Sequence, residues 1–354
     1  MAIIVSFASA ALAVAAAMLG PVAAQSTTAS CTALKPSYSA PSIASGYTAA
    51  PVATGLFKPR GILFDTEGRI LAVQQGKGIV GLTLNDAGGT CVSVKENKTV
   101  VENKDLNHGI ALSPDGKTLY ASSSEEVFSW IYDPSTGTVG DNKTLIKGMK
   151  NSDHVTRTLL LSQKMPGILL VSRGSADNID EGVVDIKISR SQIKSFDLNQ
   201  IGDKVYDFTN DGTIIGWGLR NAVGVAEDPT SGAIYSVENS SDDLYRLGKD
   251  IHNNNPGEKL NFHGYLNGTK TAEQGGNFGH PQCYAVWDVN DLPEHGNLTV
   301  GKQFAINITE TVNDDFCQKE RIAPRLTFQA HMAPLDIKFS ADGKEAYVTF
   351  HGSW

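Results

Sequence analysis

The stretch GVAEDPTSGAIYSV, residues 224–237, decides the fold. Two short apolar segments flank the polar turn EDPTSG, and alternation of apolar and polar positions is typical of strands with one buried face. Asp, Pro, Ser and Gly favour tight turns, because Gly tolerates the positive φ that such turns require. The stretch therefore predicts a β-hairpin.

The same pattern recurs along the chain. It is found in GILFDTEGRILAV, GIALSPDGKTLYAS and DIKFSADGKEAYVT, and in more degenerate form in TLLLSQKMPGILLVS, at residues 61–73, 109–122, 336–349 and 158–172. Single hairpins cannot bury their apolar faces alone, so this repetition predicts an all-β propeller with blades around one axis. A β-sandwich with similar hairpins is the alternative. The last copy ends in FHGSW, directly after a strand, which predicts that a final blade is missing.

The N-terminal residues have the pattern of a secretory signal peptide. An apolar, Ala-rich run reaches Leu19, and the small residues that follow indicate cleavage after Ala24. A membrane anchor is the weaker alternative, since the run is shorter than the roughly 20 residues that span a bilayer. Residues 25–53, rich in Ser, Thr, Ala and Pro, predict a loosely ordered lead-in, and residues 54–354 form the predicted propeller domain.

Cysteines and glycosylation sequons also fit a secreted, extracellular protein. An even number of cysteines predicts two disulfides, and proximity in the sequence favours Cys31–Cys91 and Cys283–Cys317 among three possible pairings. No CxxC spacing is present, so a zinc site is not expected. The N-x-S/T sequons are at Asn97, Asn142, Asn239, Asn267, Asn297 and Asn307.

The net charge of the chain limits which classes of binding partner are expected. The formal net charge is -8 and the chain has no basic run and no basic amphipathic helix. Nucleic acid, a polyanion, would be repelled, and no membrane partner is expected. A neutral small molecule such as a sugar suits this surface better.

Polar residues cluster just before the hairpins, where the loops of a propeller converge on the central channel. Arginine binds carboxylates and stacks on conjugated rings, and histidine can act as a base near neutral pH. Such a cluster predicts an anionic, planar or polyoxygenated ligand, although the same groups could instead satisfy backbone polar atoms at strand starts. The candidates are Lys58, Arg60, Asn107, His108, Asp153, His154, Arg157, Arg220, Asn221 and His331.

Several runs carry a family resemblance. GLRNAVGVAEDPTSGAIYSVENSSDDL, residues 218–244, resembles a blade of the soluble glucose and sorbosone dehydrogenases, in which an Arg-Asn pair opens the hairpin. NHGIALSPDGKTLY, SDHVTRTLLL, DIHNNNPGEKLNFHGYL, CYAVWD, AHMAPLDIKF and FHGSW together are similar to secreted fungal pyranose dehydrogenases that depend on pyrroloquinoline quinone (PQQ). The resemblance extends from about residue 57 to residue 354 and implies a six-bladed β-propeller, here without its last blade.

The resemblance also implies an activity. It implies extracellular oxidation of pyranoses or sugar aldehydes of the sorbosone, glucosone or fucose type to a lactone or acid, with a hydride passing to PQQ and Ca²⁺ assisting. Electrons would then leave for an external acceptor such as a haem domain or a redox enzyme. The alternatives are a calcium-dependent propeller lactone hydrolase and a sugar-binding propeller without catalysis.

Residue roles follow from the resemblance position by position. His154 is implied as the base that takes the sugar hydroxyl proton, and Arg220 as the catalytic cation beside the quinone. Main-chain carbonyls of Glu238 and Asn239, in the loop after the hairpin at 224–237, are implied as calcium ligands. The implied cofactor-binding residues are Arg60, Asn107, His108, Arg157, Arg173, Arg220, Asn221, His331 and His351.

One stretch departs from the family pattern. In the soluble glucose dehydrogenases an Asp on the strand after the base orients the imidazole, whereas SRGSADN, residues 172–178, has Arg173 and Gly174 where that carboxylate would fall. Asp177, in the following loop, is the candidate replacement.

Overall fold

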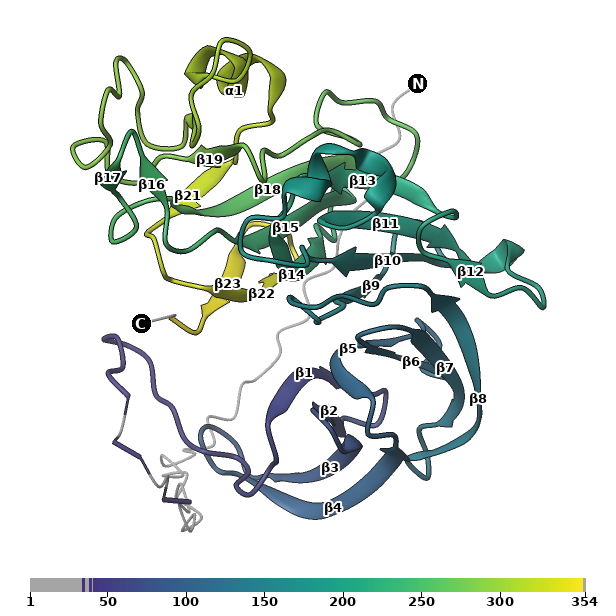
Figure 1. Ribbon diagram of the computed structural model, residues 1–354. Coiled ribbons are helices and arrows are strands. Elements are labelled where there is room, and N and C mark those ends of the chain that lie inside the picture. The colour runs from purple at the N-terminus through teal and green to yellow at the C-terminus, as the bar shows by residue number, and fades with distance from the viewer. Residues whose placement is uncertain (1–33, 36–37, 40, 353–354) are drawn as a thin grey trace, which may run out of the picture.

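The computed structural model describes residues 34–35, 38–39 and 41–352 (Figure 1). The predicted signal peptide and Cys31 lie outside the described residues, and the predicted division into signal peptide, lead-in and propeller domain stays a prediction. Within these residues the chain is mainly β-sheet, with one α-helix and three short 3-10 helices. The 3-10 helices are Glu181–Val184, Ile186–Ile188 and Leu198–Gln200.

Four sheets form the blades, and each begins with a strand beside the channel. The first blade is β1 (Pro59–Phe64), β2 (Ile70–Gln74), β3 (Gly78–Asp86) and β4 (Val92–Glu102). The second is β5 (Leu106–Leu112), β6 (Thr118–Ser123), β7 (Val127–Asp133) and β8 (Thr138–Lys147), with β12 (Tyr206–Asp207) added at its edge. The third is β9 (Leu159–Leu161), β10 (Ile168–Arg173), β11 (Gln192–Asp197) and β13 (Thr213–Trp217).

The fourth blade is β14 (Asn221–Glu227), β15 (Ala233–Asn239), β18 (Glu258–Tyr265) and β21 (Leu326–Phe328). A further hairpin, β22 (Pro334–Phe339) with β23 (Ala346–Phe350), lies beside β14. All five repeated stretches are therefore antiparallel hairpins, as predicted. The propeller-like fold is confirmed with four blades, while the total of six and the missing last blade stay predictions.

Glycine at the head of three repeats has a packing cause. A Cβ added to Gly61 would lie 2.5 Å from the carbonyl oxygen of His108, and one on Gly224 would lie 2.7 Å from the Cα of Asp336. A Cβ on Gly109 would collide with the carbonyl oxygen of Arg157. Neighbouring inner strands can therefore approach closely only because these positions carry no side chain.

The cores lie between adjacent blades. Leu71, Leu119 and Trp130 belong to one buried cluster shared by the first and second blades. Leu170 and Val225 belong to another, shared by the third and fourth blades. Each sheet buries its apolar faces against its neighbours, and this burial supplies the main favourable free energy of packing.

The long segments within the fourth blade form an excursion with its own core. It contains β16 (Tyr245–Arg246), β17 (Lys249–Asp250), β19 (Cys283–Ala285), β20 (Gln303–Ala305) and α1 (Asp314–Glu320). In Figure 1, α1 lies at the top of the view, and β16 and β17 lie to the left of β18. The buried Arg246 contacts both carboxylate oxygens of Asp314 at 2.7 Å. The predicted Cys283–Cys317 disulfide is confirmed here. No helix among the described residues is long and apolar enough to cross a bilayer.

Candidate active site

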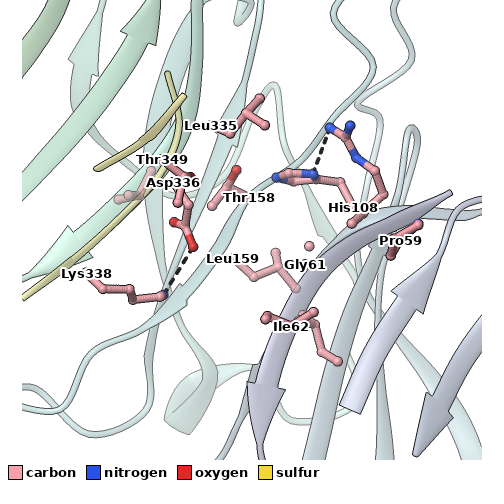
Figure 2. A pocket seen from close by; sticks show the side chains of 14 residues that line it. Pro59, Gly61, Ile62, His108, Thr158, Leu159, Leu335, Asp336, Lys338 and Thr349 are labelled. Carbon is pink, nitrogen blue, oxygen red and sulfur yellow. Dashed lines mark hydrogen bonds and ion pairs between the residues drawn. The ribbon is translucent and has the colours of Figure 1, made fainter. Parts of the chain in front are cut away.

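The inner strands surround a cavity of about 400 Å³ (Figure 2). Side chains from β1, β5, β14 and β22 and residues at the start of β9 line it, with Ile62, Ile110 and Val225 among its apolar walls. Arg60 and His108 are the predicted cofactor residues in this lining. His154 and Arg220 are not part of the lining, but each precedes a strand, β9 or β14, that contributes to it. The end of the cavity where β1, β5, β9 and β14 begin is called the mouth.

One part of the mouth is formed by β1 and β5. Arg60 Nη2 lies 3.2 Å from His108 Nδ1. Burial, followed by the positive charge of Arg60, lowers the pKa of His108 to about 4, so its imidazole is neutral over most of the working pH range. The Asn107 amide donates to the carbonyl of Val155 at 2.9 Å. Asn107 Oδ1 and Arg60 Nε are buried and have no hydrogen-bond partner among the described residues.

His154 lies in the segment between β8 and β9. Its backbone has a positive φ of 41°. Its Nδ1 lies 2.9 Å from the Ser175 hydroxyl and 3.2 Å from the Ser175 carbonyl oxygen. Burial, followed by the positive charge of Arg220, lowers the pKa of His154. The His154 imidazole therefore stays neutral, and able to accept a proton, at pH values below the ordinary histidine pKa.

Arg220 directly precedes β14 and is almost fully buried. Its Nη2 donates to Asn178 Oδ1 at 2.8 Å, and its Nε donates to the Asn178 carbonyl at 3.2 Å. A Cβ on Gly174 would lie 2.7 Å from the Cβ of His154 and 3.2 Å from the carbonyl oxygen of Arg220. The Cβ of His154 and the backbone of Arg220 therefore both pack against one glycine.

Arg157 and Arg173 use their donors on the protein itself. Arg157 is fully buried and donates to the carbonyls of His154 at 2.8 Å and Met149 at 2.6 Å. Arg173 donates to the carbonyl of Lys150 at 2.8 Å. These contacts hold the segment that carries His154, and direct binding of a cofactor by either arginine stays a prediction.

The remaining predicted cofactor residues lie around the fourth blade and the β22–β23 hairpin. His331 Nδ1 lies 3.4 Å from one carboxylate oxygen of Asp242, whose other oxygen is 3.5 Å from Arg220 Nη2. Asp242 therefore links His331 to Arg220. Asn221 opens β14, with its Oδ1 beside Gly174. His351 is exposed, and its Nδ1 lies 2.5 Å from the carbonyl oxygen of the next residue.

Glu238 and Asn239 are not in a loop, contrary to the expectation from the sequence. They are the last two residues of β15, where Asn239 pairs with Asn221 of β14 and Glu238 pairs with Lys259 of β18. The Glu238 carboxylate lies 2.9 Å from Lys259 Nζ. Asn239 Nδ2 donates to the carbonyl of Pro334 at 2.5 Å. The described residues contain no group of three or more His, Cys, Asp or Glu placed to hold a metal ion. Calcium binding through main-chain carbonyls stays a prediction.

The suggestion that the Asp177 carboxylate orients His154 is wrong. That carboxylate accepts from the backbone N–H of Asn178 at 2.7 Å, and only the main-chain carbonyl of Asp177 faces the site, where it accepts from the Ser175 hydroxyl at 2.6 Å. The sequence reasoning missed Ser175 and Asn178 as partners of the two predicted catalytic residues. The signal was the small polar run SADN directly after a strand.

Sequence reasoning also missed Glu258, at the start of β18. Its carboxylate accepts from the backbone N–H of Ser240 at 2.6 Å and from that of Ala333 at 3.2 Å. It therefore joins the loop after β15 to the segment before β22. Burial raises the pKa of Glu258 to about 7.

Comparisons with known proteins find two similar curated proteins. A PQQ-dependent sugar dehydrogenase of Hypocrea jecorina is 50% identical over 325 residues, which are 90% of this chain and 75% of that protein. A PQQ-dependent pyranose dehydrogenase of Coprinopsis cinerea is 39% identical over 318 residues, which are 88% of this chain and 42% of that protein. The chain thus spans less than half the length of this second relative.

Two solved structures are also similar to the chain over most of its length. A calcium structure of a Trichoderma reesei Carbohydrate-Active Enzymes Family AA12 protein superimposes with a TM-score of 0.87 at 50% identity, covering 91% of this chain and 80% of that one. The holo form of a pyranose dehydrogenase PQQ domain from Coprinopsis cinerea gives 0.85 at 37% identity, covering 92% and 78%. The TrAA12-like family model matches residues 41–354. From these matches it follows that the chain belongs to the TrAA12-like family.

Proposed function

We propose that the protein oxidises pyranoses or sugar aldehydes of the sorbosone, glucosone or fucose type to a lactone or acid, with PQQ as the hydride acceptor. The observation that carries the proposal is that His154 and Arg220 both lie against Gly174, close enough for the positive charge of Arg220 to lower the pKa of His154. A base and a cation placed together can act on opposite sides of one reacting bond. The names of the two curated relatives support the same chemistry.

The residues at the mouth suit a flat, anionic quinone. Arg60 Nε and Asn107 Oδ1 are buried polar atoms without a partner among the described residues, and buried polar groups normally have one. Arg60 would hold an acidic group of PQQ, with Asn107 and His108 beside it. When bound, PQQ supplies the electrophilic carbonyl that accepts the hydride.

His154 would remove the proton from the sugar hydroxyl. Its Nδ1 faces Ser175, and its Nε2 makes no hydrogen bond to any described residue, so Nε2 is the atom that can accept the proton. The lowered pKa keeps the imidazole neutral and ready at neutral pH. General bases of this kind typically contribute about 10²–10⁴-fold to rate.

Arg220 would stabilise the negative charge that develops opposite the base. Its guanidinium is held by Asn178 and by the carbonyl of Ser240 at 2.5 Å, so its position does not depend on substrate. A preorganised cation needs little rearrangement during the reaction, which is the main source of electrostatic catalysis. The nearby carboxylate of Asp242 moderates this charge without removing it.

We propose that the protein also binds Ca²⁺ beside the quinone. Calcium prefers oxygen ligands, including main-chain carbonyls, and Glu238 and Asn239 would supply them at the end of β15. The similar Trichoderma reesei structure obtained with calcium supports this choice. The ion would polarise the quinone carbonyl.

The proposal includes where the protein acts and where the electrons go. The signal-like residues 1–24 and the sequons support secretion and extracellular action, with electrons leaving for an external acceptor such as a haem domain or redox enzyme. The six-bladed architecture also belongs to the proposal. The β22–β23 hairpin lies beside β14 and has the antiparallel pairing of the first two strands of a blade, which supports a fifth blade after the four complete ones.

Reconstitution tests the function. The chain is titrated with PQQ and Ca²⁺, and the quinone absorption and sugar-dependent reduction of a dye are recorded. We expect an absorption shift and dye reduction that needs both additions. Lactone cleavage without quinone would favour the hydrolase alternative, and sugar binding without any dye reduction would favour the non-catalytic one.

A further inference from the structure

The loop after β10, residues 174–180, contacts both predicted catalytic residues. Ser175 in this loop contacts the His154 imidazole, and Asn178 contacts the Arg220 guanidinium. The backbone N–H of Ser175 also donates to the carbonyl of Arg220 at 2.8 Å. A single short loop therefore sets the position of both side chains.

Salt bridges and hydrogen bonds hold this loop in place. Asp180 makes two contacts with Arg190, at 2.6 and 2.7 Å, and its carboxylate also accepts from the backbone N–H of Ala176 at 2.9 Å. On the other side, the Asn151 amide donates to the Ser175 carbonyl at 3.1 Å. Ser175 itself is fully buried. Its hydroxyl therefore has a fixed position relative to the imidazole.

The hydrogen bonds of Ser175 decide which nitrogen of His154 carries the proton. The Ser175 hydroxyl donates its hydrogen to the carbonyl of Asp177 at 2.6 Å, so only its lone pairs remain for the imidazole. The Ser175 carbonyl, 3.2 Å from Nδ1, can only accept. Both oxygens thus require hydrogen on Nδ1, which leaves the lone pair on Nε2.

The neighbouring carboxylate is a weaker candidate for this role. The nearest oxygen of Asp153 to the ring is 3.8 Å from His154 Nδ1, beyond hydrogen-bond distance, and its side chain is 58% exposed. Its other oxygen accepts from the backbone N–H of His154 at 2.7 Å. Asp153 therefore fixes the backbone of the turn rather than the imidazole.

We propose that Ser175 is the positioning residue for His154, and that it holds the imidazole as the Nδ1–H tautomer with Nε2 free to accept a proton. The proposal deepens the proposed function and rests on it for its catalytic meaning. The tautomer itself is a property of the protein without cofactor or sugar, so it can be measured independently.

Long-range ¹H–¹⁵N spectra of the ¹⁵N-histidine-labelled protein, without PQQ, test the tautomer. The His154 signals are assigned by their loss in His154→Gln. In the wild-type protein we expect Nδ1 to have the shift of a protonated nitrogen and Nε2 that of an unprotonated one. In Ser175→Ala the main-chain carbonyl at 3.2 Å remains but the closer hydroxyl at 2.9 Å is lost, so we expect a mixture with Nε2–H, the form that free histidine prefers. Ser175→Thr keeps the hydroxyl and should restore the wild-type pattern.

Ser162→Ala is the matched control. Ser162 is also fully buried, and its hydroxyl donates to Glu227 at 2.6 Å and accepts from the N–H of Met165 at 2.9 Å, at the far end of β9 from His154. This variant should lose similar stability and leave the His154 spectrum unchanged. An Nε2–H tautomer in the wild type, an unchanged spectrum in Ser175→Ala, or an equal change in Ser162→Ala would overturn the proposal.

Turnover gives a second readout after reconstitution with PQQ and Ca²⁺. We expect kcat to fall at least about tenfold in Ser175→Ala, because part of the general-base contribution is lost when the wrong tautomer is populated, with KM little changed. Ser162→Ala should stay close to wild type. If the tautomer result holds but the wild type oxidises no sugar with PQQ, the positioning role stands and the proposed function fails. If the wild type is active and kcat is unchanged in Ser175→Ala, the positioning role fails alone.

Discussion

His154 has a left-handed backbone conformation that costs a non-glycine residue about 1 kcal/mol or more. The buried guanidinium of Arg157 donates to its carbonyl, and the hydroxyl of Ser175 contacts its ring. Strain of this kind persists only where surrounding contacts determine the geometry. The residue is therefore held by partners on both its backbone and its side chain.

Removing the imidazole separates binding from chemistry. We expect His154→Ala to bind PQQ about as well as the wild type and to lose nearly all turnover, because the imidazole is not among the groups predicted to hold the quinone. Quinone absorption titrations and steady-state dye reduction measure the two properties. His295→Ala, a histidine in the excursion, is the control and should leave both unchanged. Lost binding with turnover intact in residual holoenzyme would refute the base assignment.

The pH dependence of wild-type activity should also depend on His154. In the proposed reaction the neutral imidazole is the active form, and its pKa is lowered by burial and by the charge of Arg220. Activity should therefore persist below the ordinary histidine pKa of about 6.5 before it falls in acid. A profile of kcat/KM against pH checks this, and an acidic limb above about 6.5 would contradict it.

Single residues were predictable where type and position carried the chemistry. His154 and Arg220 could be named as candidates because each precedes a recognisable strand, and their catalytic roles stay predictions. Ser175 could not be found, because a serine hydroxyl becomes a partner of His154 only through the folded conformation of its loop. The same loop conformation turns the Asp177 carboxylate away and presents its carbonyl.

At the scale of elements, the hairpins were predictable because alternation and turn residues act locally. The end of β15 was misplaced because a charged residue such as Glu238 is typical of a loop. In the structure Glu238 forms an ion pair with Lys259 on another strand, a contact that the sequence does not reveal. The two- and three-residue strands of the excursion gave no signal. They are stabilised by distant contacts such as the Arg246–Asp314 pair and the disulfide.

A glycine exchange tests the close packing of the inner strands. In Gly224→Ala the new Cβ would lie 2.6 Å from a methyl carbon of Val237 and 2.7 Å from the Cα of Asp336. We expect a loss of about 1–3 kcal/mol in the free energy of unfolding, typical of an overpacked core. Gly140→Ala, where the nearest atom would be 3.9 Å away, is the control. Urea unfolding of both variants measures the difference, and equal midpoints would refute the packing argument.

At the scale of the whole molecule, the sequons divide by exposure. Asn239 is half-buried and its Nδ2 donates to Pro334, so a glycan there would break this hydrogen bond. The other five asparagines, which are exposed, are Asn97, Asn142, Asn267, Asn297 and Asn307.

We expect the secreted protein to carry glycans at exposed sequons and none at Asn239. Enzymatic release of glycans in ¹⁸O-water labels each formerly modified asparagine, and mass spectrometry of the peptides then locates the label. Label at Asn239 in folded, active protein would contradict the observed packing of its amide.

The bridge made by Glu258 has a consequence for storage and use. Its pKa is about 7 in the folded protein against 4.5 for an ordinary glutamate, so the native chain binds this proton more tightly than the denatured chain does. Its contribution to stability is complete below pH 4.5 and is lost as pH rises through 7. Melting temperatures measured across this interval should decline for the wild type and decline less for Glu258→Gln. The folded protein should therefore be more stable in mildly acidic solution than in alkaline solution.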